Sequence, residues 1–454
     1  MYEGLMVSVS GVRGRVGEAL TPEVVSGFAA GFGAWAASRG RSRQIVVGRD
    51  ARVSGPMFHR AVLAALQSVG CDVIDVGLAP TPTIQLAVED HHAAGGLAIT
   101  ASHNPIEWNA LKFIGPSGLF LDAADGAAMR AVVEQPIPRA TWDALGGVTR
   151  DEGAIERHIE RVLAIPFVDV EAIRRRRFRV ALDCVRGAGG AMMPALLERL
   201  GCEVTAIHLE TDGRFPRAPE PLPENLGELE RLVRESGAEV GFAVDPDVDR
   251  VALVSDAGRA IGEDWTLALA ARLVLRYRPG PLVANLSTSR IIDDVAEEAG
   301  AKVVRAPVGE ANVAARMRSE GAAVGGEGNG GVILSEVHLG RDAPVAVALL
   351  LQMLLEDNAA LSATLARYRS YSIVKDKLER PNASLEAVYQ KLCSEFSDAK
   401  VDRQDGLRLA WDDRWVHVRP SGTEPIVRVI AEGPSEADAR QLIARSRVPL
   451  DALR

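Results

Sequence analysis

Three aspartates have the clearest chemistry. Asp245, Asp247 and Asp249 alternate directly after an apolar stretch, residues 240–244. Pro246 disfavours helix at Asp245, so the segment is expected to be extended, with alternate side chains on the same side. Three neighbouring carboxylates repel one another unless a cation lies among them, and oxygen ligands suit Mg²⁺. The spacing favours a magnesium site over a solvated acidic turn.

Ser102 is the second candidate, in the turn Thr-Ala-Ser-His-Asn-Pro at residues 100–105. Serines in such turns are often helix caps or turn residues. Beside a divalent cation, however, a serine could carry a phosphoryl group, because the cation would neutralise its oxygens. His103 is not expected to be the base for Ser102, since neighbouring side chains of an extended segment point apart. It is either a substrate contact or a structural turn residue.

The segment Arg-Pro-Ser-Gly-Thr-Glu-Pro, residues 419–425, combines a cation, two hydroxyls and backbone N–H groups. Such groups can surround an anion, and arginine forks match phosphate oxygens. The alternative is an ordinary turn. The candidate phosphate contacts are Arg419, Ser421, Gly422, Thr423 and the nearby Arg428.

A glycine-rich segment, Gly-Glu-Gly-Asn-Gly-Gly at residues 326–331, lacks the Gly-Lys-Ser/Thr of a nucleotide P-loop. Glu327 and Asn329 would instead offer hydrogen bonds to hydroxyls, which suits a sugar, although a flexible surface turn is the alternative. Single arginines elsewhere are further candidate anion contacts, and these are Arg13, Arg250 and Arg290.

The elements that must position these segments repeat three times. Each copy has a β-branched strand, a helix ending at glycine and a second strand, and the copies begin at residues 45, 180 and 282. A helix-sized segment and a third strand follow, leading into one of the candidate loops. Alternating strands and helices predict parallel sheets, which bind ligands beyond the carboxyl ends of their strands. The three loops are therefore expected to share one cleft.

Beyond residue 368 the pattern changes to short strands flanked by two helices. The predicted fold is α/β, with three similar domains of mixed, mostly parallel sheets and a smaller C-terminal α+β domain. The predicted domain ranges are 1–150, 151–256, 257–368 and 369–454.

The composition of the chain argues against several classes of protein. The 454 residues are 47% apolar and 25% charged, which excludes a mainly disordered chain. The net charge of −9 argues against nucleic-acid binding. The apolar stretch 343–355 is too short to span a bilayer and predicts a buried helix. The four cysteines lack metal-ligand spacing, and no secretory leader is apparent. We expect a cytoplasmic monomer or homodimer that binds neither nucleic acid nor membrane.

Lysine use is unusual, because only six of the 52 basic residues are lysines and Lys112 is the only one before residue 302. It lies ten residues after Ser102. The pKa of lysine shifts more readily than that of arginine, which suits proton transfer. A surface lysine is the alternative.

The four loops, in this order, resemble those of the α-D-phosphohexomutase family, which holds phosphoglucomutases, phosphomannomutases and phosphoglucosamine mutases. The resemblance covers the whole chain and implies a heart-shaped, four-domain fold. It implies that Ser102 is a phosphoserine that gives its phosphoryl group to a hexose phosphate, forming a 1,6-bisphosphate. A hexose 1,6-bisphosphate would be the activator.

The resemblance also implies roles for the other candidates. Asp245, Asp247 and Asp249 would bind Mg²⁺ together with a phosphoserine oxygen, and Lys112 would lie near the transfer centre. Glu327 and Asn329 would belong to the sugar loop. The residues that would hold the non-reacting phosphate are Arg419, Ser421, Gly422, Thr423 and Arg428.

The forms of the glycine-rich and phosphate loops resemble archaeal-type members and phosphoglucosamine mutases. They favour interconversion of a hexosamine 6-phosphate and 1-phosphate. A phosphomannomutase/phosphoglucomutase of mixed specificity is the main alternative. A sugar-phosphate phosphatase and a catalytically silent sugar-phosphate-binding protein also stay open.

Overall fold

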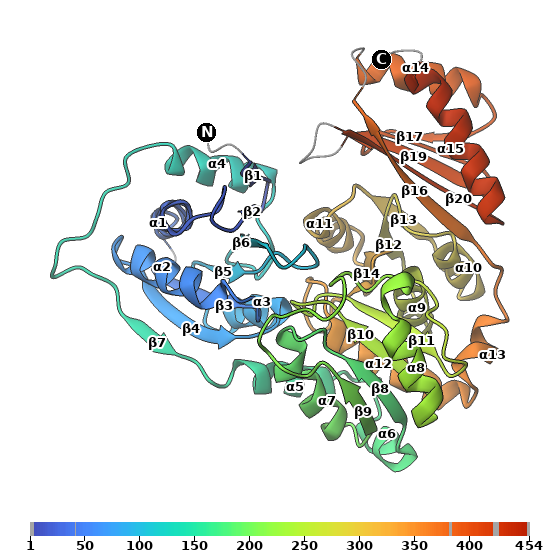
Figure 1. Ribbon diagram of the computed structural model, residues 1–454, viewed down its shortest axis with the longest axis horizontal. Helices are drawn as coiled ribbons and strands as arrows, with labels where there is room; N and C mark the ends of the chain where they lie inside the picture. Colours follow the sequence, from blue (N-terminus) through green and yellow to red (C-terminus); the bar gives the residue numbers. More distant parts are fainter. Residues whose placement is uncertain (1–3, 41, 381–383, 421–425, 452–454) are drawn as a thin grey trace.

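The computed structural model describes residues 4–40, 42–380, 384–420 and 426–451. In Figure 1 the chain passes from the first domain at the left, through the second and third, to the fourth at the upper right. Four sheets form the centres of these domains. No helix in the described ranges is long and apolar enough to cross a membrane.

The first domain has a seven-stranded sheet in which the parallel strands β3, β4, β5 and β7 adjoin antiparallel ones. In spatial order its strands are β1 (Met6–Val7), β2 (Gly11–Arg15), β6 (Trp108–Ile114), β5 (Gly95–Ile99), β3 (Gln44–Arg49), β4 (Asp72–Leu78) and β7 (Val148–Arg150). Its helices are α1 (Pro22–Ser38), α2 (Gly55–Gln67), α3 (Thr81–Asp90) and α4 (Ala123–Val133). Alternate residues of β3 face opposite sides, so Ile45 packs with α1 and α2 and Val46 with α3.

The second domain has a four-stranded sheet in the order β11-β10-β8-β9. The strands are β8 (Arg179–Asp183), β9 (Glu203–Ile207), β10 (Val240–Val244) and β11 (Val251–Ser255). The helices are α5 (Ala154–Leu163), α6 (Val170–Arg176), α7 (Met193–Arg199) and α8 (Gly227–Ser236), with 3₁₀ turns at 188–191 and 223–225.

The third domain repeats this arrangement as β13-β12-β14-β15. The strands are β12 (Leu282–Asn285), β13 (Val303–Ala306), β14 (Val324–Glu327) and β15 (Gly331–Leu334). The helices are α9 (Asp264–Tyr277), α10 (Ile291–Glu298), α11 (Glu310–Glu320), α12 (Ala343–Asp357) and α13 (Leu361–Leu365).

The fourth domain is an antiparallel sheet, β16-β20-β19-β18-β17, with two helices. Its elements are β16 (Ser372–Glu379), α14 (Leu385–Glu395), β17 (Lys400–Asp402), β18 (Leu407–Ala410), β19 (Trp415–Pro420), β20 (Ile426–Gly433) and α15 (Glu436–Asp451). The sequence analysis did not predict β16, because this edge strand is mostly half-buried or exposed and lacks an apolar pattern.

The three α/β domains share one strand order, since β6-β5-β3-β4, β11-β10-β8-β9 and β15-β14-β12-β13 correspond. The predicted repeat is therefore confirmed. The sequence analysis missed the last strand of each copy, which returns antiparallel to the third. Each candidate loop in these domains is thus the connection of a β-hairpin at the carboxyl end of a parallel strand.

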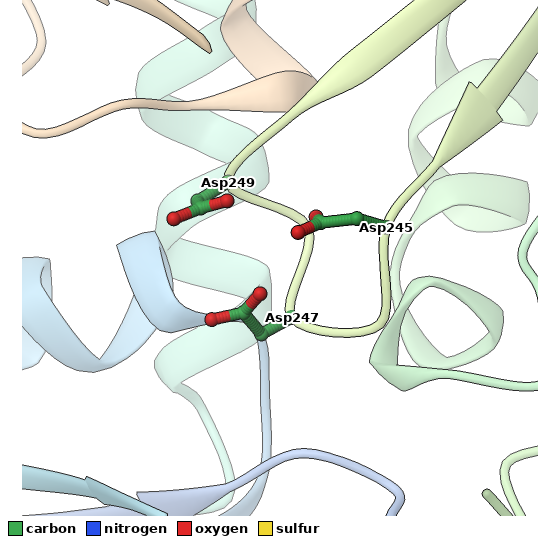
Figure 2. Close-up of side chains that lie close together, drawn as sticks. All are labelled: Asp245, Asp247 and Asp249. Atoms are coloured by element: carbon green, nitrogen blue, oxygen red, sulfur yellow. The ribbon is translucent and has the colours of Figure 1, made fainter. Parts of the chain in front are cut away.

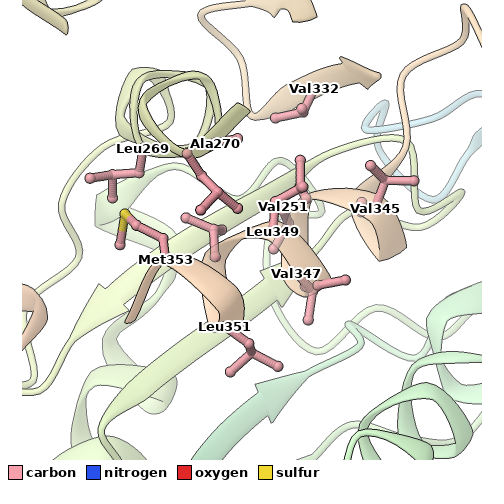
Figure 3. Close-up of a cluster of buried hydrophobic side chains, with 14 of the residues drawn as sticks. Val251, Leu269, Ala270, Val332, Val345, Val347, Leu349, Leu351 and Met353 are labelled. Carbon is pink, nitrogen blue, oxygen red and sulfur yellow. The ribbon is translucent and has the colours of Figure 1, made fainter. Parts of the chain in front are cut away.

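The second and third domains share one hydrophobic core, and α12 runs through it. Figure 3 shows Val345, Leu349 and Met353 of this helix beside Leu269 of α9 and Val251 of β11. Every residue from 343 to 354 is buried, so the prediction of a buried helix there is confirmed. A helix that is apolar all round is stable only inside a core.

Leu349→Ala should lower the free energy of unfolding of this two-domain unit by about 2–5 kcal/mol, because it leaves a cavity at a fully buried position. Urea unfolding followed by circular dichroism measures the change. The same substitution at Leu145, which is 55% exposed, should change the free energy of unfolding by less than about 0.5 kcal/mol. Equal effects of the two variants would contradict the shared core.

Candidate active site

The three aspartates lie in the connection between β10 and β11. One carboxylate oxygen from each of Asp245, Asp247 and Asp249 lies within 4.8 Å of the others, and all three residues are fully buried. Figure 2 shows the three side chains pointing toward one another. The segment is a compact turn, in which the N–H of Val248 donates to the carbonyl of Asp245 at 3.1 Å. The extended conformation predicted from sequence is therefore wrong, although the expected convergence of the side chains is present.

These residues fit a divalent cation. In the described part of the chain, Asp247 Oδ1 and Asp249 Oδ1 are buried without a hydrogen-bond partner. Burial and repulsion from Asp249 and Asp247 raise the pKa of Asp245 well above its usual range. Buried carboxylates with uncommitted oxygens are the ligands that Mg²⁺ takes in proteins, and a cation would relieve their repulsion.

Ser102 lies in the hairpin connection between β5 and β6 and is 7% exposed. Its hydroxyl donates to Asp245 Oδ2 at 3.0 Å, so the first and second domains meet at this oxygen. His103 Nδ1 lies 3.2 Å from Ser102 Oγ. The expectation that these two side chains point apart is wrong, because Ser102 has a φ of 48° and the backbone is not extended there.

Lys112, on β6, reaches across to the connection between β10 and β11, residues 245–250, here called the metal loop. Its ammonium donates to Asp247 Oδ2 at 2.6 Å and lies 3.7 Å from Asp249 Oδ2. Burial alone would lower the pKa of Lys112, but the two carboxylates outweigh burial and raise it. Lys112 thus lies where it can neutralise charge beside the carboxylates, and the proton-transfer role expected from its sequence context stays a prediction.

Two of the predicted single arginines flank the Ser102 loop. Arg13, on β2, donates to Asn104 Oδ1 at 3.2 Å, and Arg250 Nη1 lies 3.5 Å from Glu220 Oε1. Burial, Arg250 and Arg13 together lower the pKa of His103 well below its usual value. His103 is thus a neutral imidazole beside the Ser102 hydroxyl.

The glycine-rich segment is packed into the structure rather than forming a loose surface turn. Glu327 is 2% exposed and accepts hydrogen bonds from Asn285 Nδ2 at 2.8 Å, the Gly309 N–H at 2.9 Å and Arg341 Nη1 at 2.6 Å. Although burial alone would raise it, the pKa of Glu327 is lowered by Arg341 and Asn285. This loop therefore presents an ionised, firmly held carboxylate.

The fourth domain brings two arginines face to face. Arg419 on β19 and Arg428 on β20 are direct cross-strand partners. Arg419 Nε lies 3.0 Å from Asp405 Oδ2, and both arginines line the cavity described below, where guanidinium groups suit an anion. The other predicted members of this loop, Ser421, Gly422 and Thr423, lie outside the described residues.

Apart from the three aspartates, which are fully buried and absent from its described lining, these groups open onto one cavity of about 730 Å³ lined by residues of all four domains. Among its described lining residues are Arg13, Ser102, His103, Lys112, Arg250, Glu327, Asn329, Arg419 and Arg428. Arg290 is absent from this lining. It begins α10, its Nη1 donates to the carbonyl of Trp411 at 3.1 Å, and its N–H donates to Glu432. The structure thus places Arg290 at the junction of the third and fourth domains, not among the predicted anion contacts.

Family models match the chain in four consecutive parts. They describe the α/β/α domains I, II and III of phosphoglucomutase/phosphomannomutase at residues 5–137, 156–258 and 262–371, and the C-terminal domain at 372–447. The chain belongs to the phosphoglucomutase/phosphomannomutase family. It is thus a phosphohexomutase, an isomerase that transfers a phosphoryl group within a sugar phosphate. The family resemblance seen in the sequence is confirmed.

Individual relatives agree with this assignment. The chain is 38% identical to the probable phosphoglucosamine mutase of Methanopyrus kandleri, over 97% of this chain and 96% of the relative. It is 40% identical to the phosphoglucomutase/phosphomannomutase of Thermococcus kodakarensis, over 97% of each. The crystal structure of a phosphoglucomutase/phosphomannomutase family protein from Burkholderia thailandensis matches with a TM-score of 0.85 and 27% identity, covering 99% of this chain and 98% of that one.

Support for the Ser102 loop of this phosphohexomutase comes from a buried pair that sequence analysis missed, Arg52 and Asp50. Arg52 is fully buried, and its Nε lies 3.1 Å from Asp50 Oδ2. Asp50 also accepts from the Thr100 hydroxyl at 2.6 Å. The Arg52 guanidinium donates at 2.6–2.9 Å to the carbonyls of Ser102, Asn104, Pro105 and Trp108. Arg52 and Ser102 are 50 positions apart, so no pattern of neighbouring residues in the sequence could reveal that they are in contact.

Arg52→Met should lower the free energy of unfolding by about 3–5 kcal/mol, because Asp50 is left as a buried, uncompensated charge and four carbonyls lose their donor. Chemical denaturation gives the stability. The same substitution at Arg60, an exposed residue of α2, should have little effect. If both variants were as stable as the wild type, Arg52 would not be what holds the loop.

Proposed function

We propose that this enzyme interconverts glucosamine 6-phosphate and glucosamine 1-phosphate through a phosphoserine at Ser102 and a 1,6-bisphosphate intermediate. The observation that carries the proposal is the 3.0 Å hydrogen bond from Ser102 Oγ to Asp245, which joins a nucleophile to a set of three buried carboxylates. The same cavity offers Glu327 and Asn329 to sugar hydroxyls, and Arg419 and Arg428 to a second phosphate.

The chain's own groups account for both halves of the reaction. In the first half, the phosphoryl group of phospho-Ser102 would pass to the free hydroxyl of the bound hexose phosphate, whose proton would move to the released Ser102 oxygen. In the second half, the bisphosphate would return its other phosphoryl group to Ser102, and the Ser102 proton would move to the released sugar oxygen. The Ser102 hydroxyl must lose a proton in the return step. Two groups lie within hydrogen-bond distance of its oxygen, Asp245 Oδ2 at 3.0 Å and His103 Nδ1 at 3.2 Å. Because Asp245 would also be a ligand of the cation, His103 is the candidate for the proton acceptor on geometry.

Charge neutralisation would supply most of the remaining stabilisation, as is usual for phosphoryl transfer. Mg²⁺ held by Asp245, Asp247 and Asp249 would neutralise charge on the phosphoryl oxygens. Lys112 adds a cation beside the same carboxylates.

Because the hexose must present each of its ends to Ser102 in turn, the arginine pair of the fourth domain would hold the phosphate in two orientations. A hexose 1,6-bisphosphate would act as the activator that phosphorylates Ser102.

The choice of hexosamine rests on the forms of the glycine-rich and phosphate loops and on relatives named as probable phosphoglucosamine mutases. A phosphomannomutase/phosphoglucomutase of mixed specificity is the second candidate, because the 40% identical relative carries that name. Turnover of glucosamine, mannose and glucose 6-phosphates should be compared at one concentration of matched bisphosphate. The highest kcat/KM is expected for the glucosamine compound, and an equal or higher value for mannose or glucose would support the second candidate.

Ser102→Ala should abolish interconversion and the transfer of phosphate from a bisphosphate to the protein, because the acceptor oxygen is removed. Intact-mass measurement detects the added phosphate, and Ser394→Ala, at an exposed serine on α14, is the matched control.

Activity of Ser102→Ala within tenfold of wild type would refute the phosphoserine. Release of inorganic phosphate without isomerisation would indicate a phosphatase, and a wild-type protein that never takes up phosphate would indicate a silent binding protein.

A further inference from the structure

Arg341 lies between the metal loop, residues 245–250, and the glycine-rich segment, residues 326–331, here called the sugar loop. The sequence analysis did not identify this arginine. Its Nη2 donates to Asp249 Oδ2 at 2.7 Å, and its Nη1 donates to Glu327 Oε2 at 2.6 Å. Its Nε lies 3.0 Å from Glu310 Oε2. The side chain is 9% exposed and lines the cavity. One guanidinium therefore contacts a carboxylate of each loop and a third carboxylate between them.

The backbone that carries Arg341 is firmly anchored. The next residue, Asp342, caps α12 by accepting from the Val345 N–H at 3.0 Å. The other oxygen of Asp342 lies 2.7 Å from His158 Nε2 and 2.9 Å from His338 Nε2. These contacts join the second and third domains at the base of the arginine. The guanidinium thus reaches the two loops from a fixed position.

The sugar loop is shaped to let this side chain pass. A Cβ at Gly331 would lie 2.3 Å from Cδ of Arg341, so any larger residue there would displace the arginine. Burial alone would lower the pKa of Arg341, but Asp249, Glu310 and Glu327 raise it well above its ordinary value. The group is therefore a permanent cation with a rigid fork geometry.

Arg341 binds only one carboxylate oxygen in each of the two loops. Arg341 occupies Oδ2 of Asp249, while Oδ1 has no hydrogen-bond partner in the described part of the chain. Arg341 also occupies Oε2 of Glu327, whose Oε1 accepts from Asn285 and Gly309. The position of a carboxylate in one loop therefore depends on a carboxylate in the other.

We propose that Arg341 is a positioning residue that couples the cation site to the sugar site. A bound divalent cation would restrain Asp249 and a bound hexose phosphate would restrain Glu327, and because one guanidinium bridges the two carboxylates, each ligand lowers the cost of ordering the other site. This coupling rests on the proposed mutase function, which supplies the two ligands. Coupling of this kind is reciprocal and can be measured as a ratio of dissociation constants.

Calorimetric titration of the dephosphorylated enzyme with glucosamine 6-phosphate tests the coupling without turnover, since this form has no phosphoryl group to transfer. In the wild type, the dissociation constant should be about tenfold lower with Mg²⁺ than with EDTA. In Arg341→Lys this ratio should fall below about twofold, because lysine keeps the charge but cannot bind two carboxylates as a planar fork. An unchanged ratio in Arg341→Lys would overturn the proposal.

Arg272→Lys is the matched control. Arg272 has a side chain 5% exposed and pairs with Asp357 and Glu298, none of which lines the cavity described above. This variant should keep the tenfold ratio, and equal loss in both variants would show a general effect of disturbing a buried arginine. If Arg341→Lys fails to fold, Glu327→Gln weakens the same bridge from its other end and should reduce the ratio equally. A full ratio in Glu327→Gln would overturn the proposal.

Phosphate uptake by Ser102 separates this proposal from the function on which it rests. A wild-type enzyme that takes up phosphate from a bisphosphate, but binds the hexose phosphate equally with Mg²⁺ and EDTA, would refute the coupling and leave the mutase intact. A wild-type enzyme that neither takes up phosphate nor binds the hexose phosphate would refute the mutase, and the coupling with it.

Discussion

The main physical constraint on this structure is that several buried carboxylates repel one another and need positive charges beside them. Asp245, Asp247 and Asp249 lie within one turn, and Glu310 and Glu327 lie beside them, all nearly inaccessible to water. Burial of ionised groups is costly unless opposite charges compensate them. Lys112 and Arg341 supply two such charges from the first and third domains. A divalent cation at the three aspartates would supply further positive charge.

Repeated architecture explains how these charges meet. Each α/β domain ends its third strand in a hairpin at the carboxyl edge of its sheet, and each hairpin carries one functional loop. The Ser102 loop needs additional support, because its backbone is left-handed at the serine. The buried Asp50–Arg52 pair provides it by binding four loop carbonyls. A preorganised nucleophile of this kind loses little entropy in the reaction.

The domains are joined to different extents. The second and third domains share the core around α12, so their two loops are held in one unit. The fourth domain has its own core and contributes Arg419 and Arg428 to the cavity from a separate sheet. An enzyme that holds its substrate in two orientations benefits from a phosphate site carried on a separately folded part.

The sequence by itself determined the repeat and the fold class, because strand periodicity and turn residues are local signals. Acidic, hydroxyl and basic side chains in turns pointed in the same way to Ser102, the aspartate triad, Glu327, Arg419 and Arg428, whose roles stay predictions. Local geometry was misjudged where the backbone is left-handed, at Ser102, so His103 was placed on the wrong side. Only the tertiary structure decided that Arg290 lies at a domain junction, that Lys112 pairs with Asp247, and that Arg52 and Arg341 contact the loops. Arg52 meets Ser102 50 positions away and Lys112 meets Asp247 135 positions away, while Arg341 joins Glu327, 14 positions away, to Asp249, 92 positions away. No spacing along the chain encodes these contacts.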